Sequence, residues 1–302
     1  MKKFLVIVHI YYVDQVEELS NLIKALNFDD DEYDLFISVS EDKLADLDLN
    51  KYFYGAKVIP CKNVGYDIWP FLNVIQHVEL NNYKYLIKMH TKRDLGYKIV
   101  YIAKKYFFWG WQWRRALLSF LRRDHFVKTL DAFEKKTNLG MVNSYILIDE
   151  CYSSEELFHY KFCFDEVNRI LKKMDFKFQN PIKYIAGTMF ICRANLLSPL
   201  KKLSYSDKDF CNVDRNNEND LPHILERLFG AVVTAQGYTI EDPFTSFPSK
   251  ALLSATSIFI WLNMHRWVKK TTRFLFRVDF DKRNKRKIIK IFKIKVFTVS
   301  CK

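Results

Sequence analysis

A short apolar run that ends abruptly in polar residues most constrains the fold of this chain. Residues 85–89 (YLIKM) are typical of a buried strand, and the sequence then continues as His90-Thr91-Lys92-Arg93. In an open α/β sheet, ligands bind beyond the carboxyl ends of the strands. A strand that ends in hydrogen-bond donors and positive charge therefore predicts a bound anion at that edge of a sheet.

Strands and helices alternate through the first part of the chain, which predicts a mostly parallel sheet flanked by helices. Apolar, β-branched runs at 4–10, 34–39 and 57–59 are the other expected strands of this part. We expect Asp14 to cap a helix whose apolar positions are Val16, Leu19, Leu22, Ile23 and Leu26. Asp67 is expected to cap a second helix that opens Ile68-Trp69-Pro70, because proline is tolerated in a first helical turn.

The later elements are predicted from shorter patterns. Residues 139–143 and 231–235 are expected strands, and residues 162–174 and 221–229 are expected helices. Residues 184–192 (YIAGTMFIC) are expected to form one strand interrupted by Gly187, where a ligand or another backbone segment approaches closely.

The positive charge of the chain is concentrated at its C-terminal end. The formal net charge is +13, and residues 265–302 hold nine Lys and five Arg against two Asp, a net charge of +12. A nucleic-acid-binding domain would carry its basic patch on the domain itself, so this class is disfavoured. We divide the chain into a main domain at 1–242, a linker and apolar segment at 243–264 and a basic tail at 265–302.

The basic tail is either a solvated segment or one that contacts a membrane surface, and its composition favours the membrane surface as a partner. Lys and Arg are interleaved with Trp and Phe there, a composition typical of a segment that lies on anionic lipid. The sequence has no run of about 18 apolar residues that would predict a membrane-spanning helix. Its six cysteines form no CxxC pair, which is typical of thiols in a reducing compartment. We therefore expect a cytoplasmic protein, peripheral at the inner face of the cytoplasmic membrane.

The residues around the central strand favour an anion site that uses neither a metal ion nor a cofactor. Mg²⁺ prefers carboxylate oxygen, whereas the strand ends in His90 and Lys92. Lys92 would neutralise phosphate charge directly, and His90 would donate a hydrogen bond or stabilise a leaving group. Asn63, Gly65 and Asp67 form a turn before a helix whose first N–H groups could also face an anion.

Two further clusters are candidates for the same site. Trp113 and Arg114 lie in an aromatic and basic segment at 106–123, where they either form ordinary core and rim or stack on a sugar and grip phosphate. In the helix expected at 221–229, the polar face holds His223, Glu226 and Arg227. That face is either solvated or lines a cleft and supplies a general base.

Seven motifs, in order, resemble rhamnan synthesis protein F, a family of bacterial glycosyltransferases of polysaccharide and lipopolysaccharide assembly. The resemblance implies a GT-A-like, Rossmann-related domain, a nucleotide-diphosphate sugar donor such as dTDP-rhamnose, and a lipid-linked or growing glycan acceptor. The motifs are VHIYY (8–12), NVGYDIWPF (63–71), YLIKMHTK (85–92), WRRALL (113–118), LGMV (139–142), AGTMF (186–190) and HILER (223–227). The candidate residues that follow are Glu218, Asp220, His223 and Glu226 for catalysis, and His9, Asn63, Gly65, Asp67, His90, Lys92, Trp113, Arg114, Gly187 and Arg227 for substrate binding.

The chain departs from the family pattern just before the last motif. Where the family tends to show an Asp-Gly-Thr-like run, this chain has Glu218-Asn219-Asp220. Whether Glu218, Asp220 or Glu226 removes the acceptor proton is left open, and so is the donor sugar. The expected reaction is an inverting, metal-independent transfer in which the diphosphate leaves toward His90 and Lys92. The alternative is a non-catalytic partner of another transferase that binds a glycan or a nucleotide sugar.

Overall fold

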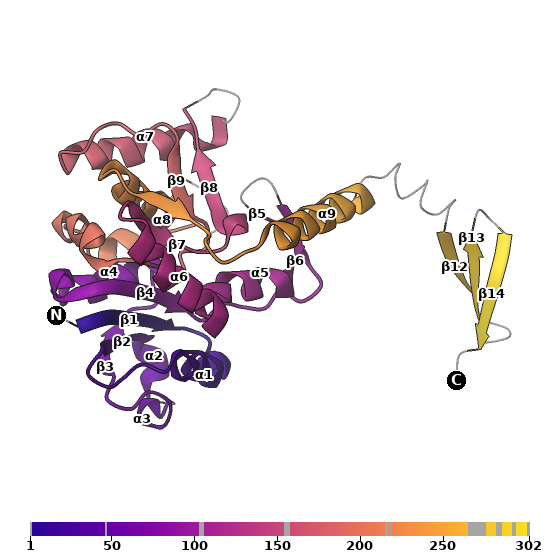
Figure 1. The fold of residues 1–302 in the computed structure, drawn as a ribbon, viewed down its shortest axis with the longest axis horizontal. Coiled ribbons are helices and arrows are strands. Elements are labelled where there is room, and N and C mark those ends of the chain that lie inside the picture. Colours follow the sequence, from indigo (N-terminus) through magenta and orange to yellow (C-terminus); the bar gives the residue numbers. More distant parts are fainter. Residues whose placement is uncertain are drawn as a thin grey trace. The chain divides into compact units, whose positions relative to one another are not determined.

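The computed structural model divides the chain into two compact units (Figure 1). It describes residues 2–45, 47–102, 106–153, 158–214, 217, 219–264, 276–281, 286–291 and 294–300. The first unit comprises Met1–Lys105 and Trp109–Ser246, and the second comprises Tyr106–Phe108 and Phe247–Lys302.

The first unit is built on a seven-stranded sheet of order β11-β7-β10-β4-β1-β2-β3. Strands β4, β1, β2 and β3 are parallel, β10 is antiparallel to both of its neighbours, and β11 is parallel to β7. This confirms the predicted α/β class and the mostly parallel sheet. The strands of this sheet are β1 (Lys2–Ile10), β2 (Tyr33–Ser40), β3 (Lys57–Cys61), β4 (Tyr83–His90), β7 (Leu139–Val142), β10 (Phe190–Arg193) and β11 (Thr239–Glu241).

Helices pack on both faces of this sheet, as the alternation of side chains along β4 shows. Tyr85 packs against Phe133 of α6, with ring centroids 4.9 Å apart. Lys88, three residues further on, points to the opposite face, where its ammonium lies 5.2 Å from the ring centroid of Phe71 in α4. The helices of the unit are α1 (Val16–Leu26), α2 (Glu41–Leu44), α3 (Leu49–Tyr52), α4 (Ile68–Gln76), α5 (Gly110–Leu117), α6 (Arg123–Lys135), α7 (Phe158–Lys173) and α8 (Leu221–Ala235).

Three local predictions were wrong. Asp14 lies inside a 3₁₀ turn, Val13–Gln15, and does not cap α1. The single strand expected at 184–192 is two strands, because Gly187 and Thr188 form a turn between β9 (Ile182–Ile185) and β10. β9 then pairs with β8 (Ile148–Cys151) rather than with the main sheet. The strand expected at 231–235 is the end of α8, where Ala231, Val232 and Val233 are buried by helix packing.

The second unit contains a helix and a separate antiparallel sheet. Residues 247–264, within the segment expected to be a linker, form α9 (Phe247–Met264). β12 (Phe276–Asp281), β13 (Arg286–Ile291) and β14 (Ile294–Ser300) form the sheet, in that order. Among the described residues, no helix is long and apolar enough to cross a membrane. Two short strands remain, β5 (Ile99–Ile102) and β6 (Tyr106–Trp109).

Candidate functional site

The strand order of the main sheet changes direction between β1 and β4. From β1 the chain adds β2 and then β3 on one side, and β4 joins the other side of β1. Such a switch point opens a crevice at the carboxyl ends of the two strands, which is where ligands bind in α/β sheets. His9 and His90 are register partners at these two ends.

A pocket of about 420 Å³ lies at this switch point. Sequence reasoning had proposed seven of its lining residues, which are His9, Asn63, Asp67, His90, Lys92, Trp113 and His223. Six more line it, namely Tyr11, Tyr12, Tyr66, Thr91, Arg93 and Leu95. Residues from β1, β4, α5, α8 and the turn before α4 therefore meet at one place.

A buried ion pair lies beneath the pocket. Asp67 sits at the N-cap position of α4, as expected, but its carboxylate does not bond to the helix N–H groups. It pairs instead with Lys88 of β4, whose Nζ lies 2.6 Å from Asp67 Oδ2. Lys88 Nζ also lies 2.9 Å from the Thr188 carbonyl oxygen and 2.9 Å from Thr188 Oγ1. The three donors of an ammonium thus face three acceptors.

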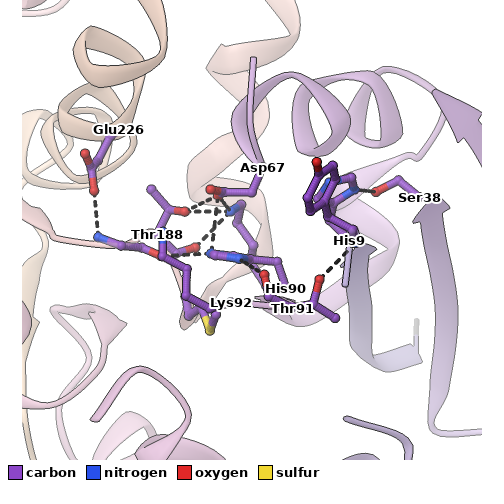
Figure 2. Close-up of polar contacts among 12 residues, drawn as sticks. His9, Ser38, Asp67, His90, Thr91, Lys92, Thr188 and Glu226 are labelled. Carbon is purple, nitrogen blue, oxygen red and sulfur yellow. Dashed lines mark hydrogen bonds and ion pairs between the residues drawn. The ribbon is translucent and has the colours of Figure 1, made fainter. Parts of the chain in front are cut away.

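Thr188 closes this cluster with a strained backbone. Its hydroxyl donates to Asp67 Oδ2, so the oxygen that accepts from Lys88 also donates to the carboxylate (Figure 2). Thr188 has φ of 54°, a conformation that is unusual for a β-branched residue. Strain of this kind persists where surrounding contacts fix it, commonly at functional sites. Here the bonds to Lys88 and Asp67 fix it.

The electrostatics of the pair follow from its burial. Burial would raise the pKa of the Asp67 carboxyl, but His90, Lys88 and Lys92 together lower it. Burial lowers the pKa of Lys88, an effect that the Asp67 carboxylate opposes. The three matched acceptors around Nζ favour the charged form of Lys88, and the two side chains neutralise each other.

His90 is held by the backbone on both sides of its ring (Figure 2). Nδ1 lies 3.0 Å from the Thr91 carbonyl oxygen, and Nε2 lies 3.0 Å from that of Gly187. Burial lowers the pKa of His90 to about 4, which favours the neutral ring, and a neutral ring has one N–H, so only one of these two carbonyl oxygens accepts a hydrogen bond from it. Both ring nitrogens already have backbone neighbours. His90 therefore connects the end of β4 to the Gly187–Thr188 turn. This structural role is better supported by its contacts than a direct contact with a ligand.

His9 is the second buried histidine of the pocket. Its Nδ1 lies 3.1 Å from Ser38 Oγ on the neighbouring strand β2 (Figure 2). Burial lowers the pKa of His9 to about 3, so this ring is neutral at pH 7 as well. The positive charge of the pocket therefore comes from the residues that follow β4.

The turn after β4 is braced so that Lys92 and Arg93 are available to a ligand. Thr91 Oγ1 accepts hydrogen bonds of 2.9 Å from the N–H groups of both Tyr11 and Tyr12. The Lys92 N–H donates to Gln15 Oε1 at 2.9 Å. No ion pair engages the side chain of Lys92 or Arg93 within the described part of the chain. The carboxylate of Asp67 is neutralised by Lys88, so the pocket presents net positive charge.

Arg114 does not line the pocket, although we expected it to grip phosphate. Its Nε donates to the Lys92 carbonyl oxygen at 3.0 Å, and its Nη2 pairs with Glu18. The guanidinium therefore braces the turn from behind. Arg227, also proposed as a substrate-binding residue, is buried, with Nη1 donating to the His223 carbonyl oxygen at 2.8 Å.

Two of the three proposed catalytic carboxylates, Glu226 and Asp220, are not among the residues that line the pocket. Glu226 accepts a hydrogen bond of 2.6 Å from the Gly187 N–H and so supports the same turn (Figure 2). Asp220 accepts from Asn217 Nδ2 at 2.6 Å and from the Asp214 N–H. Glu218 lies outside the described residues.

His223 is the candidate base that the pocket contains. Its Nδ1 lies 3.0 Å from the carbonyl oxygen of Asn217. A carbonyl oxygen can only accept, so Nδ1 carries the proton in the neutral ring and Nε2 keeps its lone pair. The loop before α8 thereby fixes the tautomer that a general base requires.

Gly187 cannot be replaced without moving the pocket wall. A Cβ there would lie 2.5 Å from Leu117 Cδ2 and 3.1 Å from the Trp113 ring, and φ is +82°. Gly65 is similarly enclosed, since a Cβ would lie 2.6 Å from the Phe210 ring.

We expect Gly187→Ala to lower the free energy of unfolding by more than the cost of placing alanine at a positive φ angle. Gly237 has φ of +84°, and a Cβ added there would have no atom within 4 Å, so Gly237→Ala is the matched control. The control should cost about 1–2 kcal/mol from the left-handed conformation. Gly187→Ala should cost about 1–3 kcal/mol more, because of the overlap with Leu117 and Trp113. Urea denaturation measures both, and equal losses would contradict the crowding argument.

Sequence reasoning missed Lys88 and Thr188. The available signal was a lysine in the middle of an otherwise apolar strand, because a buried lysine requires a partner. The partners could not be named from the sequence, since Asp67 is brought to Lys88 by the packing of α4 on the sheet, and Thr188 by the antiparallel pairing of β10 with β4.

Taken together, the fold and the site define an α/β protein with a basic pocket at the switch point of a mostly parallel sheet. Among the described residues, no group of three or more His, Cys, Asp or Glu side chains is placed to hold a metal ion. A scan against protein families matches residues 1–238 to rhamnan synthesis protein F. The chain therefore belongs to the rhamnan synthesis protein F family, as its motifs predicted, and this membership suggests a part in polysaccharide synthesis. A search of curated proteins found no match.

Proposed function

We propose that this protein is a glycosyltransferase with a GT-A-like domain, which moves a sugar from a nucleotide-diphosphate donor to a cell-surface polysaccharide or lipopolysaccharide acceptor. The observation that carries the proposal is the position of Lys92 and Arg93, two cations without ion-pair partners among the described residues, at the switch point of the sheet. A diphosphate is the ligand chemistry that two adjacent cations in such a crevice suit. Family membership supports the sugar as the group transferred.

The proposed reaction is a single inverting displacement. His223 Nε2 takes the proton of the acceptor hydroxyl, whose oxygen then bonds to the anomeric carbon. The bond between that carbon and the diphosphate oxygen breaks through an oxocarbenium-like state. The charge on the departing diphosphate is stabilised by Lys92 and Arg93, while His90, Arg114 and Glu226 hold the surrounding turns in place.

Four parts of the proposal rest on the family and on composition. The donor would be dTDP-rhamnose or another deoxysugar nucleotide, and the acceptor a lipid-linked glycan. The reaction would be metal-independent because Lys92 and Arg93 supply the charge that Mg²⁺ would otherwise supply. The protein would act in the cytoplasm at the inner face of the membrane, with the basic tail at 265–302 on anionic lipid. Residues 265–275, 282–285, 292–293 and 301–302 of that tail lie outside the described residues.

Transfer from nucleotide sugars to glycan acceptors, measured with purified protein, tests the proposal. We expect Lys92→Ala to weaken donor binding by roughly tenfold to a hundredfold, the value of a charge-assisted contact to phosphate. Lys172→Ala, at an exposed lysine of α7 that does not line the pocket, is the control. A chelator should leave transfer unchanged, and loss that Mg²⁺ restores would refute the metal-free site.

A non-catalytic sugar-binding partner of another transferase is the alternative. It predicts that nucleotide sugars or glycans bind and shift the melting temperature, while neither transfer nor donor hydrolysis is detected. The His223 ring in the pocket favours the enzyme, since binding of a sugar nucleotide does not by itself require a proton acceptor beside the anion site.

A further inference from the structure

Helix α9 exposes a face that is apolar throughout. Its large exposed side chains are Phe247, Leu252, Ile258 and Phe259, which are 83%, 69%, 59% and 67% exposed. At about 100° per residue they fall within one arc of the helix. The other exposed residues of that arc are Pro248, Ala251 and Ala255, so it contains no charged or hydrogen-bonding side chain.

The opposite face of α9 is buried. Ser257 and Ile260 are both 3% exposed. Ser257 Oγ accepts a hydrogen bond of 2.6 Å from the Phe107 N–H. The helix is thus fixed by one side while the other faces solvent. A contiguous exposed apolar patch of this kind marks an interaction surface.

The sequence that follows indicates the chemistry of the partner. Residues 265–302, directly after α9, carry a net charge of +12. An apolar helix face that is followed in the sequence by dense positive charge is complementary to a bilayer surface, which offers acyl chains beneath anionic headgroups. A protein partner would have to match the apolar face and the positive charge separately, whereas a lipid surface matches both.

We propose that the exposed face of α9 inserts into the interfacial layer of an anionic membrane, with the basic tail as its electrostatic counterpart. The proposal assigns the apolar contact with the acyl chains to α9, which precedes the basic tail in the sequence. This inference rests on the contact between tail and lipid in the proposed function, but it does not depend on the proposed sugar transfer, because the pocket residues play no part in it.

Binding of the full-length protein to sedimented vesicles tests the proposal. Vesicles of phosphatidylcholine mixed with phosphatidylglycerol should bind the protein, and vesicles of phosphatidylcholine alone should bind it much less. Ile258→Asp and Leu252→Asp should each weaken binding by roughly tenfold or more, since each removes a buried apolar side chain from the bilayer contact. Val127→Asp is the matched control, because Val127 is also a β-branched helical residue and is 58% exposed.

The outcomes separate the possible occupants of this face. Binding that is unchanged in Ile258→Asp and Leu252→Asp overturns the proposal, and so does equal loss in Val127→Asp. If the face instead joins two copies of this chain, Ile258→Asp will lower the oligomeric state measured without vesicles and leave vesicle binding intact. Thermal melting should be alike for all three variants, since each position is exposed, and Ile258→Leu should retain binding.

Discussion

Replacing Lys88 with methionine is expected to lower the free energy of unfolding by about 3–5 kcal/mol, the cost of leaving one partner of a buried ion pair alone. Lys88 is 2% exposed, and its ammonium bonds to Asp67 and to two oxygens of Thr188. Methionine has a similar length but no donor, so the Asp67 carboxylate would stay buried with the Thr188 hydroxyl as its hydrogen-bond donor and His90 Nε2 3.6 Å away. The strained backbone of Thr188 would lose two of its fixing bonds.

The same strand provides the control for Lys88→Met. Lys84 pairs with Glu134 at 2.5 Å, but both side chains are exposed, at 38% and 62%. An exposed pair contributes about 0–1 kcal/mol, so Lys84→Met should have little effect on urea denaturation. The double variant Lys88→Met/Asp67→Asn should lose less than the sum of its single variants, since it removes both charges. Equal costs for Lys88→Met and Lys84→Met would mean that the ion pair does not stabilise the fold.

The sheet was predictable from the sequence where strands are continuous and apolar. β1, β2 and β4 were found within a few residues of their ends, because each is a buried run with a polar boundary. β10 was misjudged because YIAGTMFIC reads as one strand, while the positive φ angles at Gly187 and Thr188 turn the chain between two different sheets. The 231–235 segment was misjudged because buried helices and buried strands are both apolar throughout.

The sequence predicted many of the residues at the site, but it predicted their individual roles less well. Lys92 and His223 were proposed from their position after a strand and on a polar helix face, and both line the pocket. Arg114 and Glu226 were proposed on equally good grounds but form backbone contacts behind the lining. Which side of a turn a polar side chain occupies depends on tertiary packing, and no pattern of spacing in one sequence specifies it.

Replacing His223 with phenylalanine is expected to reduce sugar transfer by about 10²–10⁴-fold, the usual contribution of a positioned general base. Phenylalanine keeps a ring beside Tyr66, whose centroid lies 6.3 Å from that of His223, but has no lone pair to accept a proton. If Lys92 and Arg93 hold the donor, as proposed, donor binding should persist. The variant should therefore lose kcat while the affinity for the nucleotide sugar, measured by calorimetry, stays within about threefold, a change of less than 1 kcal/mol.

Glu226→Gln and Asp220→Asn distinguish His223 from the carboxylates that the sequence left as alternatives. Glutamine keeps the oxygen that accepts from the Gly187 N–H, so the turn is preserved while the negative charge is lost. If His223 is the base, Glu226→Gln should retain most of the transfer rate, and so should Asp220→Asn, whose side-chain oxygen can still accept from Asn217. A loss of 10²-fold or more in either carboxylate variant, with near-normal transfer in His223→Phe, would move the proton-abstracting role from the histidine to that carboxylate. Normal transfer in all three would leave Glu218 as the remaining proposed base, so Glu218→Gln completes the set. Because each substitution removes one proton acceptor at a time, the pattern of rates identifies which group takes the proton.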